Sequence, residues 1–182
     1  MSLVILTEER SMEPVLRSIL KKLDVDQTLV TIISHEGKSD LERSIPRKLR
    51  GWLDPKARFL ILRDNDRGNC TKRKSHLLSL VSGTGREPHT MVRIVCQELE
   101  AWFLADPDAL ERAGYLKVGH RPAFTKNDPD IIPHPVHVMK NLWRGYGKGS
   151  GAAKIAPHLD LNNTRSASFR NTVSAIRQLL AA

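Results

Sequence analysis

The chain has 182 residues, 40% of them hydrophobic and 27% charged, which is the composition of a globular protein large enough to have a core of its own. Its apolar runs are too short to cross a bilayer, and its first residues lack the basic segment and apolar stretch of a signal peptide, so we expect a cytoplasmic protein without a membrane segment. The net charge of +9 favours polyanionic partners such as nucleic acid.

The first part of the chain alternates strand and helix patterns. A short apolar strand is expected at Leu3–Leu6, and an amphipathic helix is expected to begin near Ser11. The β-branched run Thr28–Ser34 predicts a buried strand. Ser39 and Glu42 have the spacing of a capping box, which predicts the start of the next helix.

The alternation continues to the middle of the chain. Pro46 lies inside the second helix pattern and predicts a kink or a break there. Two more strands are expected at Ala57–Leu62 and Met91–Cys96, and they are followed by helices at Asn69–Val81 and Glu98–Ala105. Alternation of this kind predicts an α/β fold with a parallel sheet of about four strands flanked by helices.

The chain after this alternation is less regular. Asp106 before Pro107 predicts a helix N-terminus, and Gly114 predicts the end of that helix. Residues 117–135 carry four prolines and little periodicity, so we interpret them as an irregular excursion. A short helix is expected over residues 137–143.

The last part of the chain ends in a clear helix pattern. Glycines recur through residues 145–151, which we interpret as a flexible loop. An apolar stripe predicts that the final helix docks on the core, and its members are Phe169, Val173, Ile176 and Leu180. We therefore expect one domain, with an α/β core at residues 1–116 and an excursion with C-terminal helices at residues 117–182 that packs on the same core.

Acidic residues follow all four expected strands, and they are Glu8, Glu9, Glu36, Asp64, Asp66, Glu98 and Glu100. Because the carboxyl ends of parallel strands meet at one edge of a sheet, we expect these side chains to gather there. Two carboxylates about 4 Å apart repel by roughly 4 kcal/mol at an effective dielectric constant of about 20, so the cluster must spread, take up protons or share a cation. Mg²⁺ suits an all-oxygen site of this kind and would activate water or polarise a phosphoryl oxygen.

Each acid also has a structural interpretation. Asp64 and Asp66 are residue types that often form turns. Glu98 and Glu100 also suit the negatively charged first turn of a helix. Glu36 precedes a turn glycine and is expected to be exposed.

Other reactive residue types do not form complete motifs. Cys70 and Cys96 are expected to be reduced thiols, and two cysteines do not make a zinc site. His134 and His137 have prolines nearby and no thiolate partners, so we interpret them as surface histidines. The glycine-rich stretch lacks the spacing of a phosphate loop, although its Lys148 is expected near phosphate.

Four segments carry a resemblance to a known fold family, and they are Leu6–Glu8, His35–Leu41, Leu62–Asp66 and Gln97–Asp106. An acid after the first strand and a D-x-D after a later strand resemble the Toprim fold of primases, topoisomerases and OLD-type nucleases. More closely, nearly the whole chain resembles an uncharacterised bacterial family of Toprim-like proteins. The late matches are Lys148, Gly151–Ala152, Ile155–Ala156 and Ser166–Phe169. The run E-x-E-A-W-x-x-x-D in the last segment is the most specific part of the match.

The resemblance implies a Toprim-like parallel sheet and Mg²⁺- or Mn²⁺-dependent cleavage of nucleic-acid phosphodiesters, often beside an ATPase in phage defence. By position it implies catalytic roles for Glu8, Asp64, Asp66, Glu98 and Glu100, the first three of them as metal ligands. Toprim proteins usually place glycine after the first glutamate, where this chain has a second glutamate. That departure affects how closely the backbone can approach metal or phosphate. It therefore also affects catalytic competence.

The leading hypothesis is a metal-dependent nuclease or a related phosphotransfer enzyme, with Lys38, Lys72 and Lys148 as phosphate contacts. A second hypothesis is a non-catalytic Toprim-like module that binds an ATPase or nucleic acid. A third is a receiver-like phosphoacceptor domain, because such domains also gather acids at strand ends. The D-x-D pattern and the basic charge balance argue against the third hypothesis.

Overall fold

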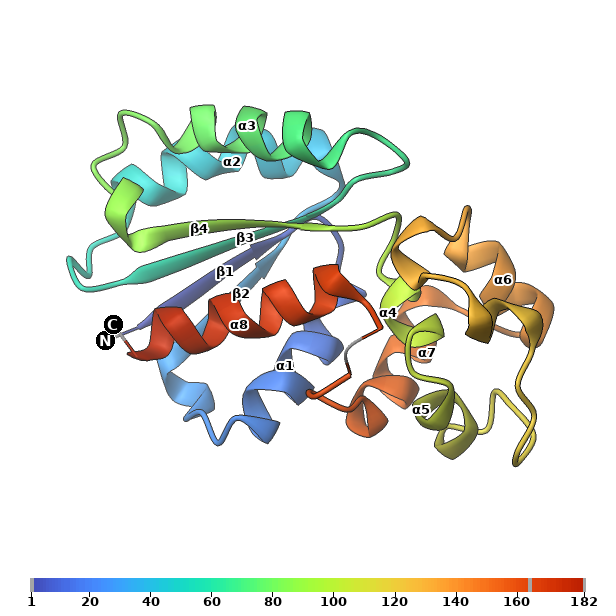
Figure 1. The fold of residues 1–182 in the computed structure, drawn as a ribbon. Helices are drawn as coiled ribbons and strands as arrows, with labels where there is room; N and C mark the ends of the chain where they lie inside the picture. The colour runs from blue at the N-terminus through green and yellow to red at the C-terminus, as the bar shows by residue number, and fades with distance from the viewer. Residues whose placement is uncertain (1, 164, 182) are drawn as a thin grey trace.

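The structure is a computed structural model that describes residues 2–163 and 165–181. Its centre is a four-stranded parallel sheet with the strand order β2-β1-β3-β4 (Figure 1). The strands are β1 (Leu3–Thr7), β2 (Val30–Ser34), β3 (Arg58–Asp64) and β4 (Thr90–Val95). The expected α/β architecture is therefore confirmed, with two strands on either side of the boundary between β1 and β3.

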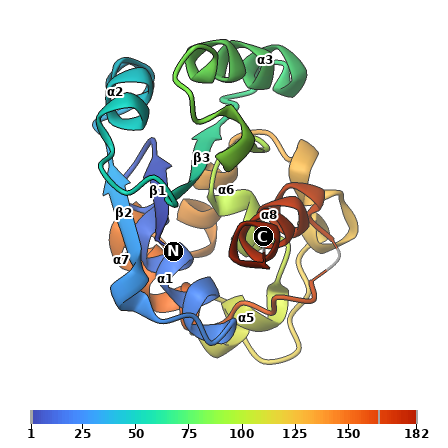
Figure 2. The same ribbon diagram turned by 90° about the vertical axis from the view of Figure 1, so that its left-hand side faces the viewer.

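Helices cover both faces of the sheet. The helices α1 (Met12–Lys22) and α8 (Ala167–Ala181) lie on one face, and α2 (Lys38–Gly51) and α3 (Cys70–Val81) lie on the other (Figures 1 and 2). Side chains of a strand alternate between the two faces, so consecutive apolar residues enter different cores. Ile5 packs in the core shared with α1 and α8, whereas Val4 packs in the core shared with α2 and α3.

The remaining helices lie beyond the carboxyl ends of the strands (Figure 1). They are α4 (Glu100–Leu104), α5 (Pro107–Arg112), α6 (Pro135–Leu142) and α7 (Lys148–Ile155). Phe124, Met139 and Ile155 from this part of the chain belong to the same hydrophobic cluster as Leu62 of β3. Trp102 is buried there, and its indole N–H donates a hydrogen bond to the Ser168 hydroxyl at 2.8 Å.

Two expectations about the first half of the chain were wrong in detail. The strand β2 begins at Val30 and forms an edge of the sheet, so most of its side chains are exposed or half-buried rather than buried. The sequence pattern gives strand content but not strand order, and only the order decides which strand is an edge. The capping box is also absent, because Gly37 is the N-cap of α2 and no side chain caps it.

Of the kink or break expected at Pro46, the break is wrong, since α2 runs from Lys38 to Gly51 without interruption. Proline in a helix interior costs about 3 kcal/mol through its missing N–H and its steric clash. Leu41, Ile45 and Leu49 of the same helix are fully buried against the sheet. Burial stabilises each such side chain by about 1.5–3 kcal/mol, which together exceeds the cost of the proline.

The glycine-rich stretch differs most from its interpretation as a flexible loop. Its second half is helical, because Gly147 is the N-cap of α7 and the helix continues to Ile155. Gly151 and Ala152 are buried, so small side chains let this helix pack closely. Tertiary packing has overridden the low helix propensity of glycine here.

The other elements follow the sequence closely. The side chain of Asp106 caps α5 by accepting a hydrogen bond from the Ala109 N–H at 2.9 Å, and the chain leaves the helix before Gly114, which has a positive φ of 76°. Cys70 and Cys96 are free thiols with their sulfurs 3.5 Å apart.

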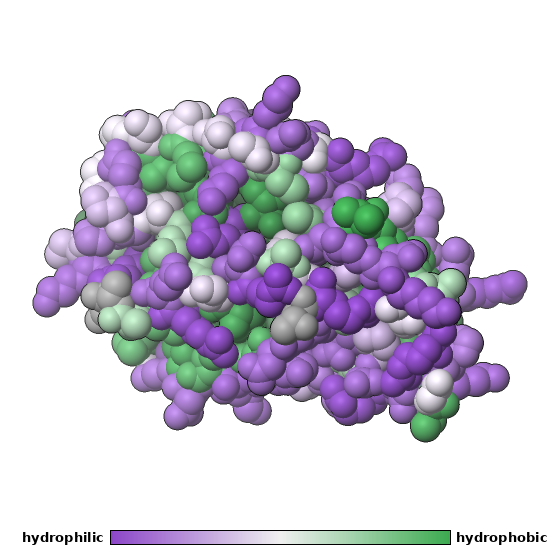
Figure 3. All heavy atoms as spheres, in the orientation of Figure 1, coloured by the Kyte–Doolittle hydropathy of each residue, from purple (hydrophilic) through white to green (hydrophobic). Residues whose placement is uncertain are grey.

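Figure 3 shows hydrophilic residues over most of one face, with the hydrophobic residues in separate patches. Within residues 2–163 and 165–181, none of the helices has the length and apolar character that spanning a membrane would require.

Candidate metal centre

The candidate site lies where the two central strands end. In the parallel register, Thr7 at the end of β1 pairs with Leu62, so Glu8 comes level with the last residues of β3, and β3 ends at Asp64. The chain leaves β1 toward β2 on one side and returns to β3 on the other. A boundary of this kind in an open parallel sheet is the usual position of a ligand site.

Three acidic side chains are almost completely buried at this boundary. Glu8 is 7% exposed, Asp64 is 3% exposed and Glu100, at the start of α4, is 1% exposed. One oxygen of each carboxyl group has no hydrogen-bond partner among the described residues, namely Glu8 Oε2, Asp64 Oδ1 and Glu100 Oε2. A buried polar atom without a partner costs free energy, so these oxygens are arranged for something other than a rigid packing role.

The acids also raise one another's pKa values. Burial raises the pKa of Asp64 well above its ordinary value of 3.8, and the carboxylates of Glu8, Glu9 and Glu100 raise it further. Burial is the first cause of the raised pKa of Glu8 as well, followed by the charge of Asp66. The charges that act on Asp64 therefore come from the loop after β1 and from the start of α4.

Arg63 is one of two cations that balance part of this negative charge. It is 1% exposed on β3, and its Nε lies 3.7 Å from Glu8 Oε2, too far for a hydrogen bond. Its Nη1 donates a hydrogen bond to Glu42 of α2, which His76 of α3 also approaches at 3.4 Å. Arg63 therefore connects the candidate site to the helices on one face of the sheet.

Lys148 is the second cation, and it comes from the first residue of α7. Its Nζ lies 3.0 Å from both carboxylate oxygens of Glu9, the residue that stands where relatives are expected to have glycine. Burial lowers the pKa of Lys148, but the hydrogen bond and charge of Glu9, followed by the charges of Glu100 and Asp64, outweigh it and raise the pKa above its ordinary value. Lys148, which the sequence analysis expected near phosphate, therefore lies at the acidic site, with Glu9 as its partner.

Tyr146 is a site residue that the sequence analysis did not identify. Its buried hydroxyl donates a hydrogen bond to Glu100 Oε1 at 2.9 Å. Its ring lies against Gly151, where a Cβ atom would come within 2.2 Å of Tyr146 Cε2. The available signal was weak, because a tyrosine between glycines in an apparent loop gives no periodic pattern.

Asp66 and Glu98 lie at the rim of the site. They line a hollow of about 140 Å³ with Arg67, Gln97, His134 and Pro135. Glu98 also has a structural role, because its Oε2 accepts a hydrogen bond from the Val136 N–H at 3.1 Å in the first turn of α6. His134 is exposed as expected, and its Nε2 lies 3.1 Å from Arg67 Nη1.

The backbone around this hollow is unusual. Four of its lining residues have positive φ angles, namely Asp66 (47°), Arg67 (63°), Gln97 (65°) and His134 (50°). Positive φ is costly for residues other than glycine, and such residues concentrate at functional sites. Their grouping supports a functional role for this edge of the sheet.

Asn65, between the two aspartates, holds the two loops of this edge together. Its Oδ1 accepts hydrogen bonds from the N–H groups of Gln97 at 2.8 Å and Arg67 at 3.0 Å, and its Nδ2 donates to the Gly68 carbonyl at 3.1 Å. It is 4% exposed. The sequence showed this residue only as the middle of D-N-D, so its positioning role was missed.

The other expected residues lie outside the cluster. Lys38 and Lys72 are exposed in the first turns of α2 and α3, and Lys72 lines a shallow hollow of about 290 Å³ with Arg73 and His76. The side chain of Glu36 is 87% exposed and lies 3.9 Å from Arg10, so the acid after β2 does not join the buried cluster and its structural interpretation as an exposed residue holds.

The oxygen atoms fit a divalent cation in kind. Carboxylates are the ligands that Mg²⁺ prefers, and three of them here have an unpartnered buried oxygen. Among residues 2–163 and 165–181, no three acidic, histidine or cysteine side chains are already close enough together to hold a metal ion. Binding would therefore need the carboxylates to draw together, in a site where Arg63 now lies beside Glu8 and Lys148 pairs with Glu9.

Comparisons with known proteins agree with this fold. A family model described as "Domain of unknown function (DUF4276)" matches residues 6–177. Among solved structures, the C-terminal region of the Xanthomonas campestris pv. campestris OLD protein has a TM-score of 0.61 and 19% identity, covering 98% of this chain and 95% of that chain. The C-terminal region of the Burkholderia pseudomallei OLD protein has a TM-score of 0.59 and 16% identity, covering 97% and 96%.

No curated protein matches the chain. The structural matches establish the fold, and they confirm the expected Toprim-like parallel sheet, which is similar in fold to the C-terminal regions of these OLD proteins.

Proposed function

This chain belongs to the DUF4276 family, and on that premise we propose that it is a Mg²⁺- or Mn²⁺-dependent nuclease, or a related phosphotransfer enzyme, that acts on nucleic acid. The observation that carries the proposal is the set of unpartnered buried oxygens on Glu8, Asp64 and Glu100 at the boundary between β1 and β3. The fold shared with OLD proteins and the net charge of +9 support the same function.

In this proposal Glu8, Asp64 and Asp66 hold the cation. A bound divalent cation would polarise a phosphoryl oxygen and lower the pKa of water. Glu98 or Glu100 serves as a second-site ligand or as the general base that takes a proton from the attacking water. Tyr146 fixes the position of the Glu100 carboxylate through its hydrogen bond.

The basic side chains would hold the substrate. Lys148 contacts phosphate when its pairing with Glu9 opens, and Lys38 and Lys72 contact phosphates farther along the strand. We further propose a cytoplasmic protein that works in phage defence beside an ATPase, as the resemblance to OLD-type nucleases implies.

The test is cleavage of plasmid and single-stranded nucleic acid with Mg²⁺ or Mn²⁺, compared with EDTA. Cleavage should need the metal, and Asp64→Asn should abolish it because the substitution removes a buried charged ligand. Glu36→Gln is the matched control, since it removes an exposed acid that follows the neighbouring strand. Cleavage that survives both EDTA and Asp64→Asn would contradict the proposal.

One observation favours a second function, a non-catalytic module that binds nucleic acid or an ATPase. Lys148 and Glu9 form an ion pair at the edge of the site, where relatives are expected to have glycine. If this pair keeps phosphate away, calorimetry should detect metal binding while no substrate is cleaved. Glu9→Gly should then create cleavage activity, whereas the nuclease proposal expects activity before this change.

A further inference from the structure

The helices α2 and α3 carry a large share of the net positive charge of the chain. The helix α2 has five basic and two acidic residues, and α3 has three basic and no acidic residues, which gives the two helices a net charge of +6. The net charge of the whole chain is +9. The two helices pack side by side on one face of the sheet (Figures 1 and 2).

Most of this charge is available to a partner. Lys38, Arg50, Lys72 and Lys74 are exposed, and none of them forms an ion pair with another described residue. The two acids on these helices do not neutralise the surface. Glu42 is occupied by the buried Arg63, and Asp40 lies 4.0 Å from Arg43.

The position of these cations links them to the candidate site. Both helices begin at the carboxyl edge of the sheet, α2 after the loop that follows β2 and α3 after the loop that contains Asp66 (Figure 1). A helix as long as α2 extends for about 21 Å. Duplex DNA carries about one phosphate charge per 1.7 Å of its axis, so many phosphates would face the two helices.

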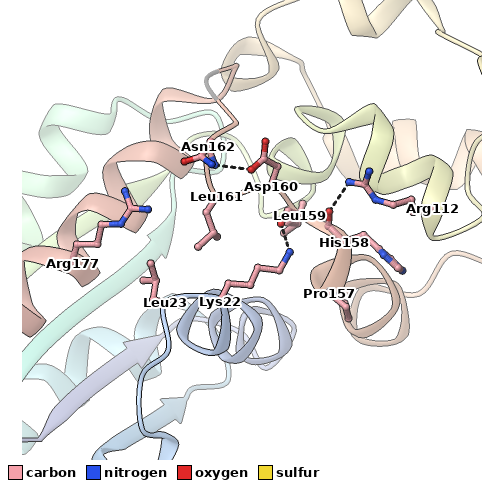
Figure 4. A pocket seen from close by; sticks show the side chains of 10 residues that line it. All are labelled: Lys22, Leu23, Arg112, Pro157, His158, Leu159, Asp160, Leu161, Asn162 and Arg177. Atoms are coloured by element: carbon pink, nitrogen blue, oxygen red, sulfur yellow. Dashed lines mark hydrogen bonds between the residues drawn. The ribbon is translucent and has the colours of Figure 1, made fainter.

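The opposite face of the sheet is less suited to this role. The helices α1 and α8 have a net charge of +4, but Arg17 pairs with Glu13 at 3.4 Å. Lys22 lines a pocket of about 530 Å³ and donates a hydrogen bond to the Leu159 carbonyl (Figure 4).

The same pocket contains Arg112 and Arg177, together with the carboxylate of Asp160 (Figure 4). Arg112 donates a hydrogen bond to the His158 carbonyl at 2.9 Å. Lys22 and Arg112 therefore hold the chain segment around residues 158–159 in place. We therefore do not assign nucleic-acid binding to this side of the molecule, and basic residues on it serve as the control in the experiment below.

We propose that the exposed face of α2 and α3, defined by Lys38, Arg43, Arg47, Arg50, Lys72 and Lys74, binds the phosphate backbone of a nucleic-acid duplex next to the acidic site. This inference rests on the proposed action on nucleic acid and names the surface that holds it. Contacts with phosphates position a duplex without reading its sequence. Binding should therefore be independent of sequence and weaken steeply with salt.

The experiment compares two triple variants of the full chain. Arg47→Gln, Arg50→Gln and Lys74→Gln remove three charges from the proposed surface, while Lys21→Gln, Lys22→Gln and Arg177→Gln remove three from the α1 and α8 side. Fluorescence anisotropy of a labelled duplex of about 20 base pairs, in EDTA, gives the affinity at several salt concentrations. Thermal unfolding of both variants shows that they fold.

The first variant should reduce the slope of log K against log salt by about 2 to 3, because each lost phosphate contact contributes about 0.9. The control variant should keep the slope of the wild type. Equal slope changes in both variants, or no change in either, would overturn the proposal. Metal-dependent cleavage is measured separately on a small phosphodiester. Duplex binding without cleavage would contradict the proposed nuclease activity but would support the proposed binding surface.

Discussion

Asp64 is an acidic residue at a buried position, and burial of a charged carboxylate opposes stability. It is the last residue of a central strand, which fixes its side chain at the ligand edge, and it is 3% exposed. Burial and three neighbouring carboxylates raise its pKa, so the folded protein holds this proton more tightly than the unfolded chain does. The site therefore costs stability at neutral pH when no cation is bound.

The first prediction is that Asp64→Asn stabilises the metal-free protein. Below pH 3.8, the ordinary pKa, the side chain is protonated in both states, and the two proteins should differ little from this source. As pH rises above 3.8, the unfolded chain loses the proton first, so the wild type loses stability relative to the variant. Each unit of raised pKa corresponds to about 1.4 kcal/mol. Urea unfolding in EDTA from pH 4 to pH 8 measures this difference.

The same series with Glu36→Gln serves as the control, because that side chain is exposed. A difference between Asp64→Asn and wild type that shrinks as pH rises would contradict the raised pKa of Asp64.

The second prediction concerns the buried Arg63. Glu42→Gln removes the charge that accepts its hydrogen bond and leaves Glu8, at 3.7 Å, as its remaining anionic neighbour. Removing one partner of a fully buried pair costs about 3–5 kcal/mol. Glu42 is 28% exposed, so we expect about 2 kcal/mol in urea unfolding at neutral pH, after discounting for solvent screening.

Asp40→Asn on the same helix is the matched control. Its pair with Arg43 is long, at 4.0 Å, and exposed, so its loss should change the free energy of unfolding by less than about 0.5 kcal/mol. Equal effects of the two substitutions would show that the buried arginine does not depend on Glu42.

At the scale of elements, sequence patterns predicted where the strands and their covering helices occur better than they predicted how exposed or closely packed those elements are. The run Thr28–Ser34 predicted a strand correctly, but its exposure depends on β2 being at the edge of the sheet. Pro46 predicted a kink or a break because local rules do not include the burial of neighbouring leucines. Glycines over residues 145–151 predicted a loop because the close packing of α7 is a tertiary property.

The third prediction tests that packing with two glycines of α7. Gly151→Ala would bring a Cβ atom within 2.2 Å of the Tyr146 ring, so the ring must move and its hydrogen bond to Glu100 should weaken. Gly149→Ala meets no atom within 4 Å and should stabilise the helix by up to about 1 kcal/mol, because alanine has the higher helix propensity. Thermal unfolding and metal titration of both variants measure the two effects.

Gly151→Ala should therefore lower both the melting temperature and the metal affinity, while Gly149→Ala should leave the affinity unchanged. Similar behaviour of the two alanine variants would show that Tyr146 is not held by this contact.

At the scale of the whole molecule, the candidate site joins parts of the chain that differ in how well they can be predicted. Glu8 and Asp64 follow from strand periodicity, because parallel strands bring their carboxyl ends together. Tyr146 and Lys148 come from the irregular second part, more than 130 residues after Glu8 in the sequence. No local pattern places them, since their position depends on how α7 packs against the core.

The fourth prediction follows from the balance of charge over the whole site. A cation that binds the folded protein and not the unfolded chain stabilises it by about 2.7 kcal/mol at 100 times its dissociation constant. Mn²⁺ or Mg²⁺ should therefore raise the melting temperature of the wild type, and more at pH 8 than at pH 5, because protons compete for the same carboxylates.

The Asp64→Asn substitution should have opposite effects on the melting temperature relative to wild type in EDTA and in the presence of metal. The variant starts from the higher melting temperature in EDTA because the repulsion is relieved, and it should gain little from added metal because a charged ligand is missing. The ranking of the two proteins should thus reverse when metal is added at pH 8. Differential scanning fluorimetry across metal concentrations measures this reversal. A variant that gains as much from metal as the wild type would place the cation away from Asp64.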